Sequence, residues 1–239
     1  MLLGRFLEVS VHAPDVAESL AFYESLGFVQ APTGEAWSHP YAVVTDGRLF
    51  IGLHQSPFES PALTWVLPDL ARHVPELQAL GIDFEFARLA DVSMHEVGFR
   101  DTSGQMITVI EARTFSPPAL APAFETQLGY FEEFVIPTTD LGRSSAFWDA
   151  LGLVAFDPEP EPFRRVAVAS RDLNVGLYDA GLDSAMLAFS ADSMADRIAT
   201  LRDRGLPFVE KLPRGLDPAE NAVLQAPDGT LLLLTTNRG

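Results

Sequence analysis

The sequence predicts an α+β protein built from four copies of a βαβββ unit, in which a strand and a helix precede two or three further strands. Three observations lead to this class. The segment from Leu3 to Phe28 recurs as Leu128 to Leu153, with every matched position 125 residues apart. In both segments, strand-like alternation precedes a helix-like stretch that ends at a glycine. The same order of elements then restarts halfway through each copy.

The first expected strand is the most informative. In residues 6–13, apolar side chains alternate with Glu8, Ser10 and His12, which is the period of a half-buried strand. Glu8, Ser10 and His12 therefore share one face. Asp15 follows at the position of a helix N-cap, so a helix is expected after it.

The remaining elements of the first copy are a hairpin, a strand, a helix and three strands, expected at 41–45, 49–54, 63–67, 70–80, 84–87, 97–100 and 106–111. Asp69 is expected to cap the second helix. The second copy repeats this plan, with strands at 131–137, 165–170, 173–178, 186–190, 208–211 and 231–235 and helices at 140–151 and 192–204.

The repeat predicts two domains. We place them at 1–115 and 125–239, joined by a proline-rich linker at 116–124. Each domain holds two units, at about 1–58, 59–115, 125–182 and 183–239.

Composition excludes several classes of function. Sixteen basic and 33 acidic residues give a formal charge of −17, which disfavours binding to nucleic acids and to anionic membranes. The chain has no cysteine, so disulfides, thiolate nucleophiles and cysteine-ligated metals are excluded. No apolar run approaches the length of a membrane span, and we expect a cytoplasmic monomer or homodimer.

The chain resembles the vicinal oxygen chelate superfamily in three features. It has four βαβββ units, a Phe-Tyr pair followed by Leu-Gly-Phe at 22–28, and an Asp-Gly turn at 228–229 before the last strand. This superfamily includes glyoxalase I, bleomycin- and fosfomycin-resistance proteins and extradiol dioxygenases. The resemblance implies that two units curl their strands into a cup that binds ligands. It also implies, for the enzymes, a divalent metal ion in the cup that stabilises developing oxyanions.

The resemblance assigns four metal-ligand positions to each cup, which correspond to Glu8, Gly52, Leu63 and Thr108 in the first domain and to Glu133, Gly176, Met186 and Leu233 in the second. Only the two glutamates could bind a metal ion, and they belong to different domains. All five histidines precede the linker. We therefore expect no metal ion and no other cofactor, with a displaced Glu8, His12 and His54 site as an alternative.

Aromatic residues suggest what binds instead. Trp37 and Tyr41 flank the first hairpin, and Trp65 shares the face of Leu63, so Trp65 either points into the cup or packs in the core. The sequence thus favours metal-independent binding of a small cationic or aromatic molecule, as in sequestration or resistance proteins. The candidate ligand-binding residues are Glu8, Ser10, His12, His54, Trp65, Thr108 and Glu133.

Two other functions stay open. One is a lyase, isomerase or dioxygenase-like enzyme that uses an off-pattern metal ion or Glu8 as its general base. The other is a scaffold whose cups are filled by side chains.

Overall fold

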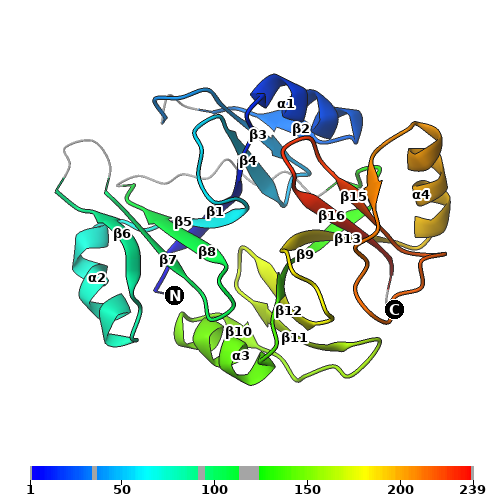
Figure 1. Ribbon diagram of the computed structural model, residues 1–239. Coiled ribbons are helices and arrows are strands. Elements are labelled where there is room, and N and C mark those ends of the chain that lie inside the picture. Colours follow the sequence, from blue (N-terminus) through cyan, green and yellow to red (C-terminus); the bar gives the residue numbers. More distant parts are fainter. Residues whose placement is uncertain (1, 34–36, 91–94, 113–123, 238–239) are drawn as a thin grey trace.

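A computed structural model describes residues 2–33, 37–90, 95–112 and 124–237. In these residues, two eight-stranded mixed sheets and four helices confirm the predicted α+β class, and one sheet follows the other along the chain (Figure 1). The expected linker at 116–124 lies almost entirely outside the described residues, so the domain bounds stay a prediction.

The first sheet contains all strands of the first two units. Its elements are β1 (Arg5–His12), α1 (Val16–Ser25), β2 (Val29–Ala31), β3 (Tyr41–Thr45), β4 (Phe50–His54), β5 (Ala62–Val66), α2 (Leu70–Ala79), β6 (Phe84–Arg88), β7 (Glu96–Arg100) and β8 (Met106–Ile110). Asp15 caps α1 as predicted, because its Oδ1 accepts a hydrogen bond from the backbone N–H of Glu18 at 3.0 Å.

The second sheet repeats the order with small changes of length. Its elements are β9 (Tyr130–Pro137), α3 (Leu141–Ala150), β10 (Val154–Ala155), β11 (Arg164–Ala169), β12 (Asn174–Asp179), β13 (Met186–Ala191), α4 (Met194–Asp203), β14 (Phe208–Val209), β15 (Ala222–Gln225) and β16 (Leu231–Thr236). Asp140 caps α3 in the way that Asp15 caps α1.

The cap of α2 differs from the prediction. Asp69 has a positive φ of 52° and makes no side-chain cap bond. Instead, Oε2 of Glu111 accepts the backbone N–H of Leu70 at 2.9 Å. A carboxylate distant in sequence therefore satisfies this helix terminus, which local sequence does not reveal.

Strand order places each opening strand at the centre of its sheet. The orders are β2-β3-β4-β1-β5-β8-β7-β6 and β10-β11-β12-β9-β13-β16-β15-β14. β1 pairs with β4 in parallel and with β5 in antiparallel orientation, so the two units of a domain meet at β1 and β5. Side chains on β1 and β9 are thus placed to reach both units.

One hydrophobic core spans the two domains. The Trp148 ring on α3 lies 6.1 Å from the ring of Trp65 on β5, and the rings of Phe28 and Phe189 are 6.0 Å apart. The four helices lie at the periphery of the molecule in Figure 1. No helix within the described residues is both long and apolar enough to cross a membrane.

Candidate functional site

Among the described residues, a cavity lies on the sheet of each domain, and we call these cavities the first cup and the second cup. The first cup has a volume of about 400 Å³ and is lined by Ser10, Trp37, Ser38, His39, His54, Ser56, Pro57, Phe58, Glu59, Ala62, Thr64, Phe86, Arg88, Glu96, Met106 and Thr108. The second cup has a volume of about 370 Å³ and is lined by Glu132, Glu133, Phe156, Glu159, Arg165, Ala167, Val168, Ala169, Asn174, Tyr178, Ala188, Ser190, Thr235, Thr236 and Asn237.

A buried glutamate lies beside a glycine in both domains. A Cβ atom added to Gly52 would lie 2.1 Å from Oε1 of Glu8, and one added to Gly176 would lie 2.5 Å from Cδ of Glu133. Glu8 is only 1% exposed and Glu133 only 7%. The glycines therefore leave the space in which each carboxylate lies against the neighbouring strand.

Three side chains donate hydrogen bonds to Glu8. Its Oε1 accepts from Ser10 Oγ at 2.9 Å and from His54 Nε2 at 2.8 Å, and its Oε2 accepts from the Tyr41 hydroxyl. Burial, followed by the charge of Glu8, raises the pKa of Tyr41 well above its usual value. Tyr41 therefore remains a phenol that donates, and these bonds offset the cost of burying the carboxylate.

His54 continues this network to a second imidazole. Its Nδ1 lies 3.0 Å from Nε2 of His39. The ring of His54 is 4% exposed and is surrounded by the rings of Trp37 at 5.1 Å, Tyr41 at 4.5 Å and Phe58 at 5.6 Å. Burial, followed by the charge of His54, lowers the pKa of His39, so His39 is uncharged at neutral pH.

A chain of hydroxyl groups reaches Glu8 from the other side. Ser10 Oγ lies 2.7 Å from Thr64 Oγ1, and Thr64 pairs with Thr108 across β5 and β8. Because Ser10 uses its proton in the bond to Glu8, Thr64 is the donor to Ser10.

A carboxylate only accepts, so the Nε2–H of His54 points to Glu8. When His54 is neutral, its Nδ1 accepts from Nε2 of His39, whereas a doubly protonated ring donates from both nitrogens. For a molecule in the cavity, Thr64 Oγ1 offers lone pairs, and so does Nδ1 of His39 beside a neutral His54. Ser38, Ser56 and Thr108 also line the cavity with hydroxyl groups.

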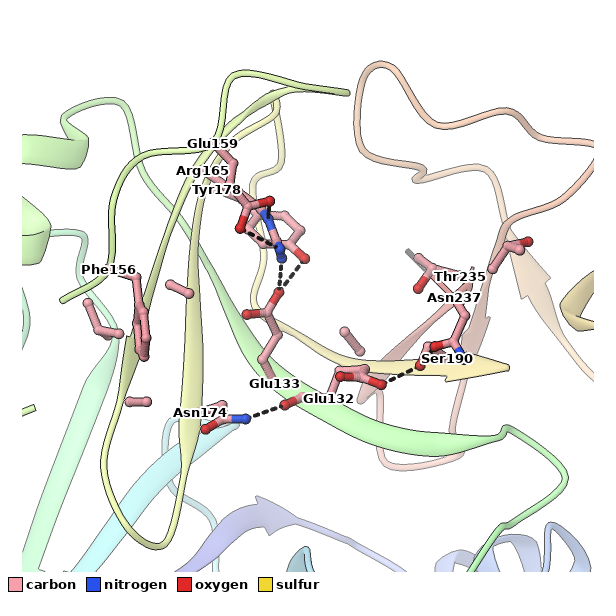
Figure 2. A pocket seen from close by; sticks show the side chains of 15 residues that line it. Glu132, Glu133, Phe156, Glu159, Arg165, Asn174, Tyr178, Ser190, Thr235 and Asn237 are labelled. Carbon is pink, nitrogen blue, oxygen red and sulfur yellow. Dashed lines mark hydrogen bonds and ion pairs between the residues drawn. The ribbon is translucent and has the colours of Figure 1, made fainter. Parts of the chain in front are cut away.

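The second cup clamps its glutamate with a cation (Figure 2). Oε1 of Glu133 accepts from Arg165 Nη1 at 2.9 Å and from the Tyr178 hydroxyl at 2.6 Å. Glu159 holds the same guanidinium with two further bonds of 2.9 Å. Burial opposes the charge, but hydrogen bonding to Glu159 and the charge of Glu133 leave the pKa of Arg165 raised.

Equivalent strand positions hold the clamps in both domains. Tyr41 pairs with His54 across β3 and β4, and Arg165 pairs with Tyr178 across β11 and β12. Both domains thus have the glutamate and the glycine. The donors at the paired positions are Tyr41 and His54 in the first domain and Arg165 and Tyr178 in the second.

Beside this clamp, the second cup has polar side chains on one side and a cluster of apolar side chains on the same face of the sheet. Glu132 accepts a bond from Ser190, and Asn174 Nδ2 donates to the backbone oxygen of Glu132 at 3.1 Å (Figure 2). Apolar side chains pack in a cluster on the same face as Glu133, at Val135, Phe163, Tyr178, Ala180, Met186, Ala188, Val223, Leu231 and Leu233.

The structure brings most of the predicted site residues together. Ser10, His54 and Thr108 line the first cup, and Glu133 lines the second. Glu8 lies beneath Ser10 and His54 and is not among the residues that line the first cavity.

Two predicted residues lie elsewhere. The expectation that Trp65 points into the cup is wrong: Thr64 faces the cavity, so Trp65 and Leu63 face the core, where Trp65 is fully buried against Phe6 and Trp148. His12 lies opposite His54 across β1 and β4, but it is not among the residues that line the first cavity. Its backbone N–H donates to Ser60, and its ring lies 6.4 Å from Phe58.

Sequence reasoning missed two members of these networks. They are His39 and Arg165, to which the sequence analysis assigned no role. The pairing of residue 41 with 54 and of 165 with 178 was the available signal, because both hairpins place these residues opposite each other.

Neither cup fits the metal ion that the resemblance implies. The resemblance places ligands on four strands of each cup. Beside Glu8, the residues at these positions in the first cup are Gly52, Thr64 and Thr108, and beside Glu133 those in the second cup are Gly176, Ala188 and Leu233. A guanidinium already lies where a cation would meet Glu133. Within the described parts of the chain, no group of three or more His, Asp or Glu side chains could hold a metal ion.

The chain resembles known proteins in its fold and not in its sequence. No protein-family model and no curated protein matches its sequence. Solved structures match it over 98% of its length. They include a catechol 2,3-dioxygenase (18% identity, 87% of that chain, TM-score 0.54), the 2,2',3-trihydroxybiphenyl 1,2-dioxygenase of Sphingomonas wittichii (18%, 90%, 0.57) and the homoprotocatechuate 2,3-dioxygenase of Arthrobacter globiformis (14%, 80%, 0.62). At this identity the likeness shows the fold.

Proposed function

Because the chain has the four-unit fold of the vicinal oxygen chelate superfamily, we propose that its first cup binds a small aromatic molecule that carries hydrogen-bond donors, without a resident metal ion. Phenols and aromatic amines are the chemical classes that meet this description. A protein that holds such a molecule unchanged acts by sequestration.

The direction of the protons around Glu8 carries this proposal. Three donor chains end at its carboxylate, through Tyr41, through Ser10 and through His54. Among the polar atoms of the cavity, Thr64 Oγ1 and, beside a neutral His54, Nδ1 of His39 are acceptors for a ligand. A ligand without a donor would leave these acceptors unsatisfied when it displaced water, which costs about 1–3 kcal/mol per group.

The walls of the first cup support an aromatic ligand. Trp37, Phe58 and Phe86 line the cavity, and a volume of about 400 Å³ is in the range of small-molecule sites. The only cationic side chain among the lining residues, Arg88, is paired with Glu96. The polar groups therefore favour a neutral or cationic ligand over an anionic one in its ground state.

The second cup supports the same use less well. Its glutamate is neutralised by Arg165, and an apolar cluster occupies the same face of the sheet. Its similar volume nevertheless makes it the natural comparison in a binding experiment.

Isothermal titration calorimetry of chelator-treated protein tests the proposal. We expect 4-methylphenol to bind with a stoichiometry of one, and its methyl ether to bind about tenfold more weakly, which is about 1.4 kcal/mol. Glu8→Gln should weaken binding, because an amide both donates and accepts and so disturbs the three chains. Glu24→Gln, an exposed change on α1, is the matched control.

Elemental analysis of the same samples completes the test. A stoichiometric divalent metal ion that is needed for binding, or equal affinity for the phenol and its ether, would overturn the proposal. Folding of Glu8→Gln is checked by circular dichroism before its affinity is interpreted.

A dioxygenase is the second candidate, because the structural neighbours named above are dioxygenases. The donor set around Glu8 and Glu133 argues against it, since the described part of the chain contains no group of three or more His, Asp or Glu side chains that could hold a metal ion. Oxygen uptake after addition of catechol and ferrous iron would decide in its favour.

A further inference from the structure

We propose that the second cup binds an organic cation, namely a primary ammonium group on an apolar carbon body, and that the Glu132 carboxylate and the carbonyl oxygen of the Asn237 amide hold the ammonium group. This is a second binding site, in the other domain and for another chemical class than the phenol site of the first cup. It does not depend on the proposed function.

A β-bulge turns Glu132 into the second cup. β9 pairs with β13 through Phe131 and through Glu133, and the residue between them, Glu132, has no partner on β13. Glu132 and Glu133 therefore both line the cavity, although they are neighbours in one strand. Figure 2 shows Glu133 turned toward Arg165 and Glu132 turned toward Ser190. The cup thus contains two carboxylates with different surroundings.

The first domain has the same bulge without the charge. In the pairing of β1 with β5, the residue without a partner is Leu7, which lies between Phe6 and Glu8 and 125 residues before Glu132. Leu7 is not among the residues that line the first cavity. The negative charge at the bulge is therefore a feature of the second cup alone.

Glu132 is the carboxylate of this cup that lacks a cationic partner. Glu133 and Glu159 share the guanidinium of Arg165, which is the only basic side chain among the residues that line the cavity. Within the described part of the chain, no basic side chain forms an ion pair with Glu132. Three carboxylates thus face one guanidinium, and the formal charge of −17 on the whole chain adds a long-range attraction for cations.

The hydrogen bonds beside Glu132 leave room for a donor. The Ser190 hydroxyl has one proton and lies beside two acceptors, Oε1 of Glu132 and, at 2.8 Å, Oδ1 of Asn237. Nδ2 of Asn237 donates to the Asp192 carboxylate at 2.7 Å, so the carbonyl side of this amide faces Ser190. One of the two acceptors is therefore always without the Ser190 proton. An ammonium group, which only donates, supplies that hydrogen bond together with a positive charge.

Phe156 offers a contact for the carbon body of the ligand. It lines the same cavity, and 56% of its surface is exposed. In Figure 2, Phe156 and Asn237 lie on opposite sides of the two glutamates. The volume of about 370 Å³ is within the range of small-molecule sites. The ligand that meets both walls is therefore an amine with an aromatic ring on a short chain.

Isothermal titration calorimetry with 2-phenylethylamine tests this site, in chelator-treated protein at neutral pH, where the amine is protonated. We expect one binding site for the amine, with the same affinity when 4-methylphenol is present at a saturating concentration. 2-Phenylethanol has the same ring and a hydrogen-bond donor but no charge. Under the same conditions it should bind at least about tenfold more weakly.

Variants test the assigned residues. Glu132→Gln should weaken amine binding at least about tenfold, because it removes the charge and keeps an acceptor for Ser190. Phe156→Ala should weaken it by about fivefold through the lost apolar contact, and it provides the test if Glu132→Gln does not fold. Glu210→Gln, at an exposed glutamate that lines neither cup, is the matched control and should bind the amine as wild type does.

The outcomes distinguish the two proposals. The absence of binding heat from the amine, equal affinity for the amine and the alcohol, or unchanged affinity in Glu132→Gln would overturn the cation site and leave the phenol site intact. Loss of amine binding in the presence of 4-methylphenol would overturn it as well, because the amine would then occupy the first cup. Amine binding that depends on Glu132, in a protein that does not bind 4-methylphenol, would overturn the phenol proposal alone.

Discussion

The carboxylate of Glu8 lies where a side chain at residue 52 would be: a Cβ atom on Gly52 would lie 2.1 Å from Oε1 of Glu8. The second domain repeats this relationship at Gly176 and Glu133. Because both glycines lie inside strands, where glycine is normally unfavourable, the close approach of the carboxylate is the reason for them. Each glutamate is thereby turned toward the hairpin strand and its clamping donors.

Gly52→Ala should therefore destabilise the first domain and weaken ligand binding. The added methyl group forces a buried, fully bonded carboxylate to move, and overpacking of this kind costs about 1–3 kcal/mol. Chemical denaturation measures the free energy of unfolding. Gly142→Ala is the control, because its Cβ would meet only Asp140 Oδ1 at 3.7 Å within a helix, and it should be neutral or stabilising by up to about 1 kcal/mol. Equal stability of Gly52→Ala and wild type would contradict the assigned role.

Arg165→Met should lower the free energy of unfolding by about 2–4 kcal/mol, because it leaves Glu133 charged and buried without its cation. The double variant Arg165→Met/Glu133→Gln should recover much of this loss. Arg164→Met, at the neighbouring and mostly exposed side chain, should change stability by less than about 0.5 kcal/mol. A double-mutant cycle with no coupling between residues 133 and 165 would refute the clamp.

Trp65→Ala should destabilise the protein by about 3–5 kcal/mol, since it removes a fully buried ring from the core that the two domains share. Trp65→Phe should keep phenol affinity close to the wild-type value, because residue 65 does not line the cavity. Trp37→Ala, in contrast, should weaken binding with a small effect on stability. A Trp65→Phe variant that folds but fails to bind would place residue 65 in the site after all.

Stability should depend on pH through His39. Its pKa is lowered in the folded protein by burial and by His54, so the unfolded chain takes up a proton first as the pH falls below the ordinary histidine pKa of about 6.5. Wild-type stability should therefore fall, relative to His39→Gln, from pH 6.5 down to the lower pKa of the folded state, and the difference should then stay constant. Parallel pH profiles for the two proteins would show that His39 has no shifted pKa.

Much of the fold was predictable because its signals are local and occur twice. The alternation around Glu8, the capping residue Asp15 and the constant spacing of the repeat indicated tandem units, and the sheets confirm them. The predicted cap of α2 was wrong, because the carboxylate that caps this helix belongs to Glu111, which is distant in sequence.

The site was predictable only in part. Strand periodicity placed Glu8, Ser10 and His12 on one face of the first strand, and the resemblance assigned Gly52 and Gly176 to positions beside the two glutamates. Trp65 was placed on the wrong face because an error of one residue in strand alignment reverses the direction of a side chain. His39 lies in a connection without periodicity, so its bond to His54 depends on how the chain returns to the sheet.

Nitrogen-15 NMR of the histidine rings tests most directly whether the protons of the first cup point toward Glu8. The hydrogen bonds predict that Nε2 of His54 and Nε2 of His39 are protonated and that both Nδ1 atoms are not, and that a divalent metal ion leaves these signals unchanged. A proton on Nδ1 of His54, or a shift of both rings on addition of the metal ion, would contradict the account.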